Sequence, residues 1–295
     1  TTEFVSNFRT AELSLDDQHR IAAYLDEQTA KIDRLMELRR RQMALLKEQR
    51  AALIQQAVTR GLNPKAPMKD SGLPWLGEIP AHWHIVRLKH LCSHIVDCLH
   101  STPNYDPEGE YPAIRTADVT PGQIDIEGAK RLFHKDYLVQ VQRLTPEEGD
   151  IVYSREGERF GIAACVPAGV SLCVSQRMMH FRVRSDVNSR FVMWQLNTKP
   201  VYSQALVYVF GATSPHINVE TITNYVLAKP PLEEQQEIAA FIESETTKLD
   251  ALHAAYARQL TLLSEYRASL IHECVTGQRP VPEPSSSQEA NAHAL

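Results

Sequence analysis

The feature that most constrains this chain is a long internal repeat. Residues 15–59 align without a gap with residues 232–276, and 20 of the 45 aligned positions are identical. The identical positions include an Ile-Ala-Ala triplet and a Val-Thr pair near the end of each copy. A repeat of this length indicates that two related elements flank the segment between them, and that the architecture is built around this pair.

Each copy has the pattern of a long coiled-coil helix. With Ala22 as heptad position a, the d positions of both copies are mostly apolar, and neither Gly nor Pro interrupts them. Thr and Arg recur at matched a positions, where polar residues specify register and partner at some cost in stability. At 1.5 Å per residue, a helix over 15–60 would be about 69 Å long, so we expect these helices to act as a spacer. The d positions are Leu25, Ile32, Arg39, Leu46 and Leu53, and then Ile242, Leu249, Tyr256, Leu263 and Leu270.

A lone heptad helix most often forms a dimerisation stalk. Two matched copies around one globular segment instead favour a pair within the chain, because a domain whose ends lie close together lets the helices run antiparallel. We therefore expect an α+β fold, in which one mixed α/β domain is flanked by two long helices that pair as an antiparallel coiled coil.

The sequence between the helices changes pattern twice. Residues 61–84 are rich in Pro and Gly and cannot continue the first helix, while Trp75, Leu76 and Trp83 indicate a linker that packs. Beyond this linker, short β-branched or aromatic runs alternate with turn signals, which is typical of a mixed domain. We expect strands near 84–88, 150–154, 161–166 and 179–183, and a helix over 189–208.

These patterns divide the chain into six segments. The last is rich in Pro, Ser and Ala and has nothing to bury, so we expect it to be disordered. The segments are an N-terminal remnant (1–14), a first helical region (15–60), a linker (61–84), a globular domain (85–231), a second helical region (232–279) and a tail (280–295).

The net charge of −5 is unevenly distributed along the 295 residues. The segment 85–231 contains 15 basic and 15 acidic residues, whereas the second helical region has three basic against eight acidic ones up to residue 277. The first helical region is slightly basic, with nine against seven. This balance argues against a protein that coats nucleic acid indiscriminately, because such binding depends on excess Lys and Arg.

The sequence contains neither a run of about 18 apolar residues nor a basic-then-apolar stretch near its first residue. Its five cysteines are widely spaced and form no CxxC pair, which indicates reduced thiols rather than a disulfide framework. We therefore expect a cytoplasmic protein that does not contact the membrane.

Motifs that carry chemistry are missing from the sequence. It has no Gly-rich phosphate loop, no nucleophile elbow and no HExxH, so we expect no catalytic residue and no cofactor. A set of histidines and cysteines has neither the close pairs nor the second distant pair that zinc sites usually show, so we expect no metal site and ordinary packing instead. These residues are His82, His84, His90, Cys92, His94, Cys98 and His100.

Basic and polar residues gather at the turn signals of the globular segment. Each alone is most often a solvated surface residue. Together, in turns between strands, they could supply contacts to phosphates and base edges. They are Lys130, Arg131, Lys135, Arg155, Arg159, Gln176, Arg177, Thr213, Ser214 and His216.

Several stretches of the sequence resemble the specificity (S) subunits of type I restriction–modification systems. They cover about residues 12–280, and their combination is specific although each is weak alone. The stretches are Pro230-Pro-Leu-Glu-Glu-Gln-Gln-Glu-Ile with its counterpart Leu15-Asp-Asp-Gln-His-Arg-Ile, the linker from Lys65 to Trp83, Asp97-Cys-Leu-His-Ser-Thr-Pro, Gly149-Asp-Ile-Val-Tyr-Ser-Arg-Glu-Gly and Gly211-Ala-Thr-Ser-Pro-His-Ile.

The resemblance implies two target recognition domains, each of which reads half of a split site in double-stranded DNA. Two helices packed antiparallel would set the gap between the half-sites and dock methyltransferase (M) subunits. Motor-nuclease (R) subunits would then join to cut unmodified DNA. The S subunit itself would catalyse nothing, which agrees with the missing motifs.

The chain departs from this pattern, because it has both helical regions but only one globular domain, the one that would be second in a full subunit. It is therefore either a half-length subunit or a fragment of a longer chain. Two half-subunits could form a homodimer that reads a symmetric split site.

On this interpretation, the turns of the 85–231 domain contact duplex DNA. The alternative is a non-catalytic protein–protein adaptor, in which a helical hairpin presents a domain that binds a peptide or a protein; the neutral charge of the domain is compatible with it. Salt-dependent retention of a mixed DNA library, with a methyltransferase partner present, distinguishes the two. The residues expected to contact DNA are Arg115, Lys130, Arg155, Arg159, Arg177, Thr213, Ser214 and His216.

Overall fold

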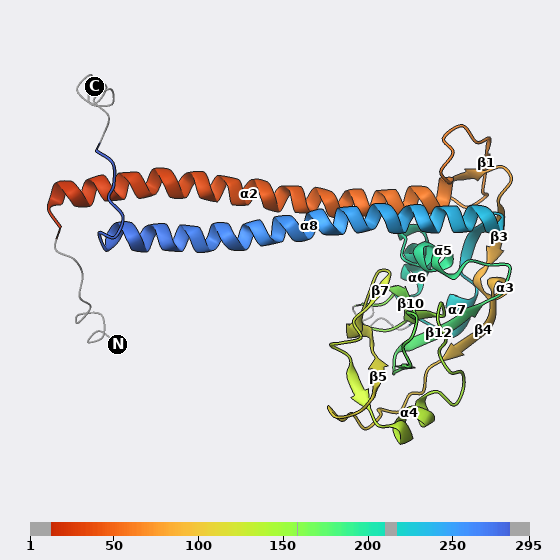
Figure 1. Cartoon of the computed structure of the whole chain (residues 1–295). Helices are drawn as coiled ribbons and strands as arrows, with labels where there is room; N and C mark the ends of the chain where they lie inside the picture. The colour runs from red at the N-terminus through yellow and green to blue at the C-terminus, as the bar shows by residue number, and fades with distance from the viewer. Residues whose placement is uncertain (1–12, 158, 210–216, 284–295) are drawn as a thin grey trace. The chain divides into compact units, whose positions relative to one another are not determined.

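The computed structural model describes residues 13–157, 159–209 and 217–283 (Figure 1). Two long helices, α2 (Leu15–Arg60) and α8 (Leu232–Val275), flank a mixed α/β domain, so the expected α+β fold is confirmed. The chain divides into two compact units. The domain unit, Arg50–Thr246, contains the mixed domain with the adjoining ends of both helices, and the helical unit contains the remainder of both helices.

In the helical unit, α2 and α8 pair along the expected heptad seam. From Thr29 of α2 and from Leu249 of α8, every residue at a predicted a or d position is buried or half-buried. Asp33 forms an ion pair with Arg267 at 3.0 Å, and the Arg39 guanidinium lies 4.9 Å from the centre of the Tyr256 ring. The numbering rises along one helix as it falls along the other, so the expected antiparallel pairing is confirmed. Arg39 occupies a heptad d position, and the other d residues of the first helix are apolar. A cation–π contact with the Tyr256 ring stabilises its charge there.

Short strands form most of the mixed domain. In chain order they are β1 (Met68–Asp70), β2 (Glu78–Pro80), β3 (His84–Arg87), β4 (Cys92–Asp97), β5 (Tyr111–Ile114), β6 (Val119–Thr120), β7 (Gln123–Ile124), β8 (Lys130–Leu132), β9 (Ile151–Ser154), β10 (Ala163–Cys165), β11 (Cys173–Val174), β12 (Met178–Val183) and β13 (Val226–Lys229). The strands expected near 84–88, 150–154, 161–166 and 179–183 correspond to β3, β9, β10 and β12.

The strands are arranged in two larger sheets and three pairs. The central sheet has the order β10-β9-β12-β4, with every neighbouring pair antiparallel. A second sheet has the order β11-β5-β8, in which β11 runs parallel to β5 and β8 antiparallel to it. The remaining pairs are β1-β2, β6-β7 and β13-β3.

Short helices connect these strands. They are α3 (Leu88–Leu91), the 3₁₀ turn η1 (Thr116–Asp118), α4 (His134–Gln140), α5 (Ser189–Leu196), α6 (Lys199–Val209) and α7 (Val219–Thr223). The single helix expected over 189–208 is wrong, because α5 and α6 are separate helices. Asn197 ends α5 and turns its side-chain amide to the backbone of Ala163 on β10, at 2.9 and 3.0 Å. Pro200 follows and has no N–H with which to continue the hydrogen bonds of α5.

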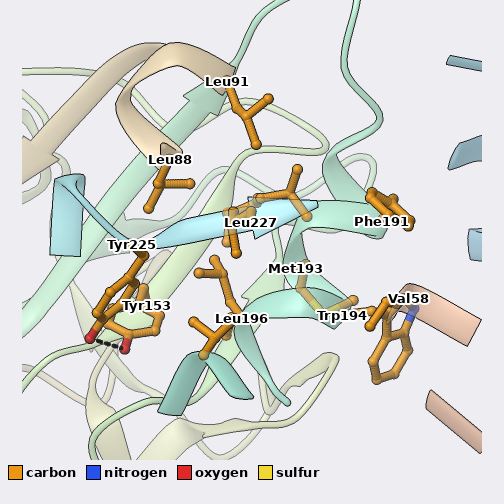
Figure 2. Close-up of a cluster of buried hydrophobic side chains, with 14 of the residues drawn as sticks. Val58, Leu88, Leu91, Tyr153, Phe191, Met193, Trp194, Leu196, Tyr225 and Leu227 are labelled. Carbon is orange, nitrogen blue, oxygen red and sulfur yellow. Dashed lines mark hydrogen bonds between the residues drawn. The ribbon is translucent and has the colours of Figure 1, made fainter. Parts of the chain in front are cut away.

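The core of the domain unit includes side chains from one end of each long helix, and Figure 2 shows the part of it around Val58 of α2. Val58, near the end of α2, is fully buried beside Trp194, and the side-chain amide of Gln195 donates to the Val58 carbonyl at 3.2 Å. Deeper in the cluster, the hydroxyls of Tyr153 and Tyr225 hydrogen bond at 3.2 Å. The helix residues buried in this core are Ile54, Ala57 and Val58 of α2 and Ile238, Ala239 and Ile242 of α8.

The linker after α2 packs against the start of α8, as its tryptophans predict. Trp83 is fully buried, and its indole N–H donates to a carboxylate oxygen of Glu234 at 3.1 Å. The Nε2 atom of His82 lies 2.7 Å from the same oxygen. These two contacts attach the end of the linker to the start of α8, where the chain enters the domain.

The seam of the helical unit can be tested with two leucines of α8. Leu270 is 1% exposed and packs with Ile32 and Cys274, so Leu270→Ala should lower the free energy of unfolding by about 2–5 kcal/mol. Leu262 is 60% exposed, and Leu262→Ala should change it by less than about 0.5 kcal/mol. Urea unfolding followed by helical circular dichroism measures both. Equal losses in the two variants would contradict the assigned seam.

Candidate nucleic-acid interface

Strands β9 and β12 lie side by side at the centre of the four-stranded sheet, and charged residues occupy both ends of this pair. The register runs from Met178 opposite Ser154 to Phe181 opposite Ile151. At one end, Asp150 precedes β9 near Arg182 of β12. At the other end, Arg155 directly follows β9 and Arg177 directly precedes β12.

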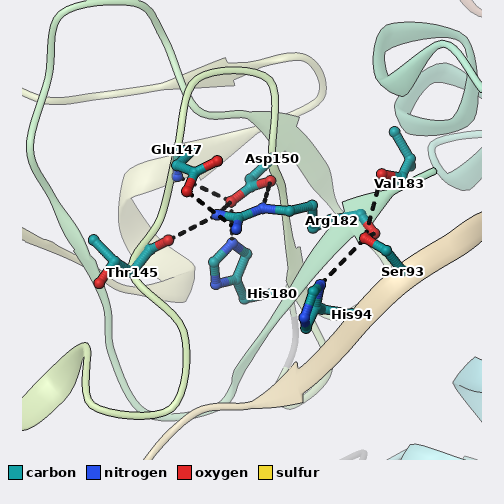
Figure 3. A network of polar contacts seen from close by, with 8 residues as sticks. All are labelled: Ser93, His94, Thr145, Glu147, Asp150, His180, Arg182 and Val183. Carbon is teal, nitrogen blue, oxygen red and sulfur yellow. Dashed lines mark hydrogen bonds and ion pairs between the residues drawn. The ribbon is translucent and has the colours of Figure 1, made fainter. Parts of the chain in front are cut away.

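At the first end, Asp150 is the centre of a buried network (Figure 3). One of its oxygens lies 2.7 Å from Nε2 of His180, and Arg182 donates to both of its oxygens at 3.0 and 2.8 Å. Burial would raise the pKa of Asp150, but hydrogen bonds from His180, from Arg182 and from the backbone N–H of Glu147 outweigh it and lower the pKa to about 2. The carboxylate is therefore ionised and ties β9 to β12.

The Asp150–His180 pair has no activated nucleophile beside it. Cys98 lines the same small cavity as His180, but burial raises the pKa of its thiol well above the ordinary value. A cysteine nucleophile needs a lowered pKa, because the thiolate is the reactive form. The network thus fits a structural role in the sheet.

At the second end, four charged side chains contact one another in series. Arg155 forms ion pairs with Asp97 at 3.0 Å and with Glu156 at 3.2 Å, and Nε of Arg177 lies 3.7 Å from Glu156. Asp97 ends β4, which pairs with β12 and places Asp97 opposite Met179. The ends of three neighbouring strands therefore bring these charges together.

Loops from distant parts of the sequence make hydrogen bonds at this same end of the sheet, near Arg155 and Arg177. The side-chain amide of Gln176 donates to the His100 carbonyl at 2.7 Å and to the Thr102 hydroxyl at 3.0 Å, and Arg155 donates to the Ile217 carbonyl at 3.3 Å. Arg177 has a φ of 68°, in the left-handed region that non-glycine residues seldom adopt. These contacts connect three loops into one surface at the end of the sheet.

The other basic residues expected to contact DNA lie near the η1 turn or on strand β8. Arg115 makes two hydrogen bonds to Asp118, at 2.9 and 2.7 Å, and Arg159 donates to the Val119 carbonyl at 2.7 Å, so both arginines lie at the η1 turn. Lys130, on β8, lies 4.5 Å from the centre of the Tyr105 ring. Thr213, Ser214 and His216 lie outside the described residues.

The structure also contains charged residues at this interface that the sequence did not indicate. Asp97 and Glu156 pair with Arg155, but Asp97 lies 58 residues from it in the chain, and no spacing rule connects them. Arg155 itself is 3% exposed, which separates it from the exposed arginines of the expected set.

Residues 13–157, 159–209 and 217–283 contain no group of three or more His, Cys, Asp or Glu arranged to hold a metal ion. Within those same ranges, no helix is long and apolar enough to span a membrane.

A family comparison gives this geometry its context. The family described as the type I restriction modification DNA specificity domain matches residues 80–261. The chain belongs to this family. The match covers more than half of the chain and includes the central sheet with both of its charged ends.

Individual relatives of this specificity chain agree with the family match. The type I restriction enzyme MjaVIII specificity subunit of Methanocaldococcus jannaschii is 22% identical over 274 residues, which are 90% of this chain and 60% of that protein. A solved structure described as the structural basis underlying complex assembly and conformational transition of the type I R-M system has the same fold, with a TM-score of 0.67 at 18% identity over 90% of this chain and 61% of that one.

A third comparison, with the crystal structure of the HsdS subunit from Thermoanaerobacter tengcongensis, gives a TM-score of 0.49 at 19% identity over 90% of this chain and 59% of that one. The specificity chain spans about 60% of the length of the curated relative and of the first solved structure that it matches.

The Asp150 network predicts a particular acid sensitivity. Because folding lowers the pKa of Asp150 to about 2, its ionisation stabilises the fold above about pH 4, and that stabilisation, about 2 kcal/mol, is lost as the pH falls from about 4 to about 2. Asp150→Asn should be less stable at neutral pH and should lose less stability over that acidic range. Urea unfolding followed by fluorescence of the tryptophans, all in the domain unit, measures this.

Glu108→Gln is the matched control, because Glu108 is an exposed carboxylate of the same domain. Its pH profile should follow that of the wild type. An Asp150→Asn profile as steep as the wild-type profile would contradict the role given to the network.

Proposed function

We propose that this chain recognises a specific sequence in duplex DNA within a type I restriction–modification complex, and directs methyltransferase and motor-nuclease subunits to a split target site. The observation that carries the proposal is the match of the specificity family over residues 80–261. The basic residues at the strand ends and at the η1 turn support it, because arginines on loops supply phosphate and base contacts in many DNA-binding proteins. The chain itself acts without a catalytic residue or a cofactor.

Retention of a mixed duplex DNA library tests the proposal. The full chain, assembled with a type I methyltransferase subunit, should retain DNA in a salt-dependent way and enrich a sequence motif. The adaptor alternative predicts binding to a protein or peptide and no enriched motif. Retention without any motif would contradict sequence-specific recognition.

We propose that the members of the expected set other than the buried Arg155 contact the DNA: Arg115, Lys130, Arg159 and Arg177, with Thr213, Ser214 and His216. Their neutral domain supplies little non-specific attraction, so affinity would depend on the partner subunits and sequence choice on this domain.

Arg159 gives a direct prediction. If Arg159 reads a base, Arg159→Ala should weaken binding to the enriched motif by about 5- to 100-fold and leave binding to random DNA nearly unchanged. Competition binding with the two kinds of DNA measures the difference. Equal losses assign Arg159 to a phosphate, and unaltered binding removes it from the interface.

We propose that methyltransferase subunits dock on an apolar stripe of the helical unit. Leu45 and Leu262 occupy equivalent positions of the two repeats, are identical and are 62% and 60% exposed. Leu35 and Leu252 form a second such pair, at 38% and 40%. Residues that are apolar, exposed and repeated in both copies fit a surface that receives the same partner twice.

If these leucines form the docking surface, substituting them should weaken binding of the methyltransferase subunit without changing the stability of the helices. Leu45→Asp with Leu262→Asp should weaken binding of the methyltransferase subunit by at least 10-fold, because it places charge on an apolar contact, and should leave helical unfolding nearly unchanged. Ala44→Asp is the control, since Ala44 is exposed on another face of α2. Binding measured by calorimetry that is equal in all three proteins would contradict the assignment.

A second recognition domain would fit the start of α2. Gln18 and Gln235 occupy equivalent positions, and each donates to the carbonyl five residues before it, at 2.9 and 2.8 Å. Gln235 is buried and also accepts the backbone N–H of Asn188, whereas Gln18 is exposed. Ala22 is likewise exposed, where its counterpart Ala239 is buried.

We propose that a domain of the same kind covers the start of α2, and that a homodimer of two such chains would read a symmetric split site. Sedimentation at micromolar concentration, with and without partner subunits, measures whether the homodimer forms. A monomer in both conditions would exclude it.

We also place the chain in the cytoplasm, because all five cysteines are free thiols in the structure.

A further inference from the structure

The charged residues at the end of β9 form a series of alternating sign that reaches the surface at Arg177. The order is Asp97, Arg155, Glu156 and Arg177, and the exposed fractions of these side chains are 23%, 3%, 17% and 63%. We propose that Arg177 reads a guanine of the target DNA, and that Glu156 and Arg155 position it. This inference rests on the proposed function and names the residue that sets specificity.

The chemistry of the Arg177 side chain fits this role. An arginine donates two parallel hydrogen bonds to O6 and N7 of guanine, which is the commonest specific contact in the major groove. Glu156 approaches Arg177 from the Nε side, at 3.7 Å, and so restrains the guanidinium without engaging the two terminal nitrogens. A side chain that is already restrained loses less conformational freedom when it binds.

The backbone of Arg177 supports the same role. Its φ of 68° is unfavourable for a residue with a Cβ atom and persists only where the surrounding structure fixes it. The backbone N–H of Arg155 donates to the Arg177 carbonyl at 3.1 Å, and the neighbouring Gln176 is attached to His100 and Thr102. Such strained positions cluster where a protein aims a side chain at a ligand.

Arg155 acts through Arg177 in this arrangement. At 3% exposed, its guanidinium lies behind Glu156 and is paired with Asp97 and Glu156, so it does not reach a base in this conformation. Its position holds the Glu156 carboxylate that faces Arg177. The sequence predicts Arg155 and Arg177 as equal DNA contacts. In this arrangement Arg177 contacts the base, whereas Arg155 is a positioning residue.

The test is sequencing of a randomised duplex DNA library retained by the full chain with a type I methyltransferase subunit. The wild type should enrich a motif that contains a guanine. Arg177→Gly should lower the preference for that guanine by about 10- to 100-fold and leave the other positions of the motif unchanged. Its unfolding midpoint should stay the same or rise, because glycine adopts this φ freely.

Glu156→Gln keeps the shape of the side chain and removes its charge, so it should weaken the preference at the same guanine by about 3- to 10-fold and leave the other positions unchanged. Arg177→Lys should not restore the preference, because lysine lacks the planar fork. Arg184→Gly and Asp186→Asn are the matched controls, since this pair is also an exposed arginine beside a carboxylate, at 3.3 Å. Both should retain the wild-type motif.

A motif that survives Arg177→Gly and Glu156→Gln unchanged overturns this inference and leaves the proposed function standing. Changes at different positions of the motif in the two variants overturn the positioning role of Glu156. An equal loss on all sequences assigns Arg177 to a phosphate and also overturns the inference. A wild type that enriches no motif removes the proposed function and this inference with it.

Discussion

The domain unit depends on the burial of two helix ends in a single core. The last turns of α2 and the first turns of α8 contribute Ile54, Val58, Ile238 and Ile242 to the same cluster, and each of these side chains is at most 5% exposed. Trp83, fully buried at the end of the linker, donates to Glu234 at the start of α8. Removing these apolar surfaces from water requires that the chain enter and leave the domain at neighbouring points. Helices that meet the domain at neighbouring points can then pair antiparallel, as the Asp33–Arg267 and Arg39–Tyr256 contacts show.

Charge pairing organises the centre of the same domain. Buried charges are costly unless they are paired, and each end of the β9–β12 pair satisfies this condition with residues from several segments. Asp150 ties β9 to β12 through Arg182 and His180, while Arg155 connects Asp97 to Glu156 at the opposite end. Both groups continue to an exposed side chain, the first through Arg182 to the Glu147 carboxylate and the second through Glu156 to the Arg177 guanidinium. Because DNA phosphates are anionic, the sign of the exposed charge is the basis for treating the second end as the candidate interface.

The helices could be predicted from the sequence because their signal is local and repeated. Heptad periodicity over 45 aligned positions fixes the buried face of each helix, and the strands β3, β9, β10 and β12 were indicated by β-branched runs. The break between α5 and α6 was missed, because it depends on Asn197 reaching the backbone of Ala163, a contact across 34 residues. The candidate interface could be predicted only in part. Its arginines are recognisable by residue type, but the burial of Arg155 and its pairing with Asp97 arise from the order of strands in the sheet.

We propose that this chain chooses the DNA sequence on which a type I complex acts. Methylome sequencing of cells that express the chain with its methyltransferase subunit, compared with cells that lack only this chain, measures that choice most directly. We expect methylated bases confined to one split motif and present only when the chain is expressed. Identical methylation in the two kinds of cell would show that the chain does not choose the DNA sequence.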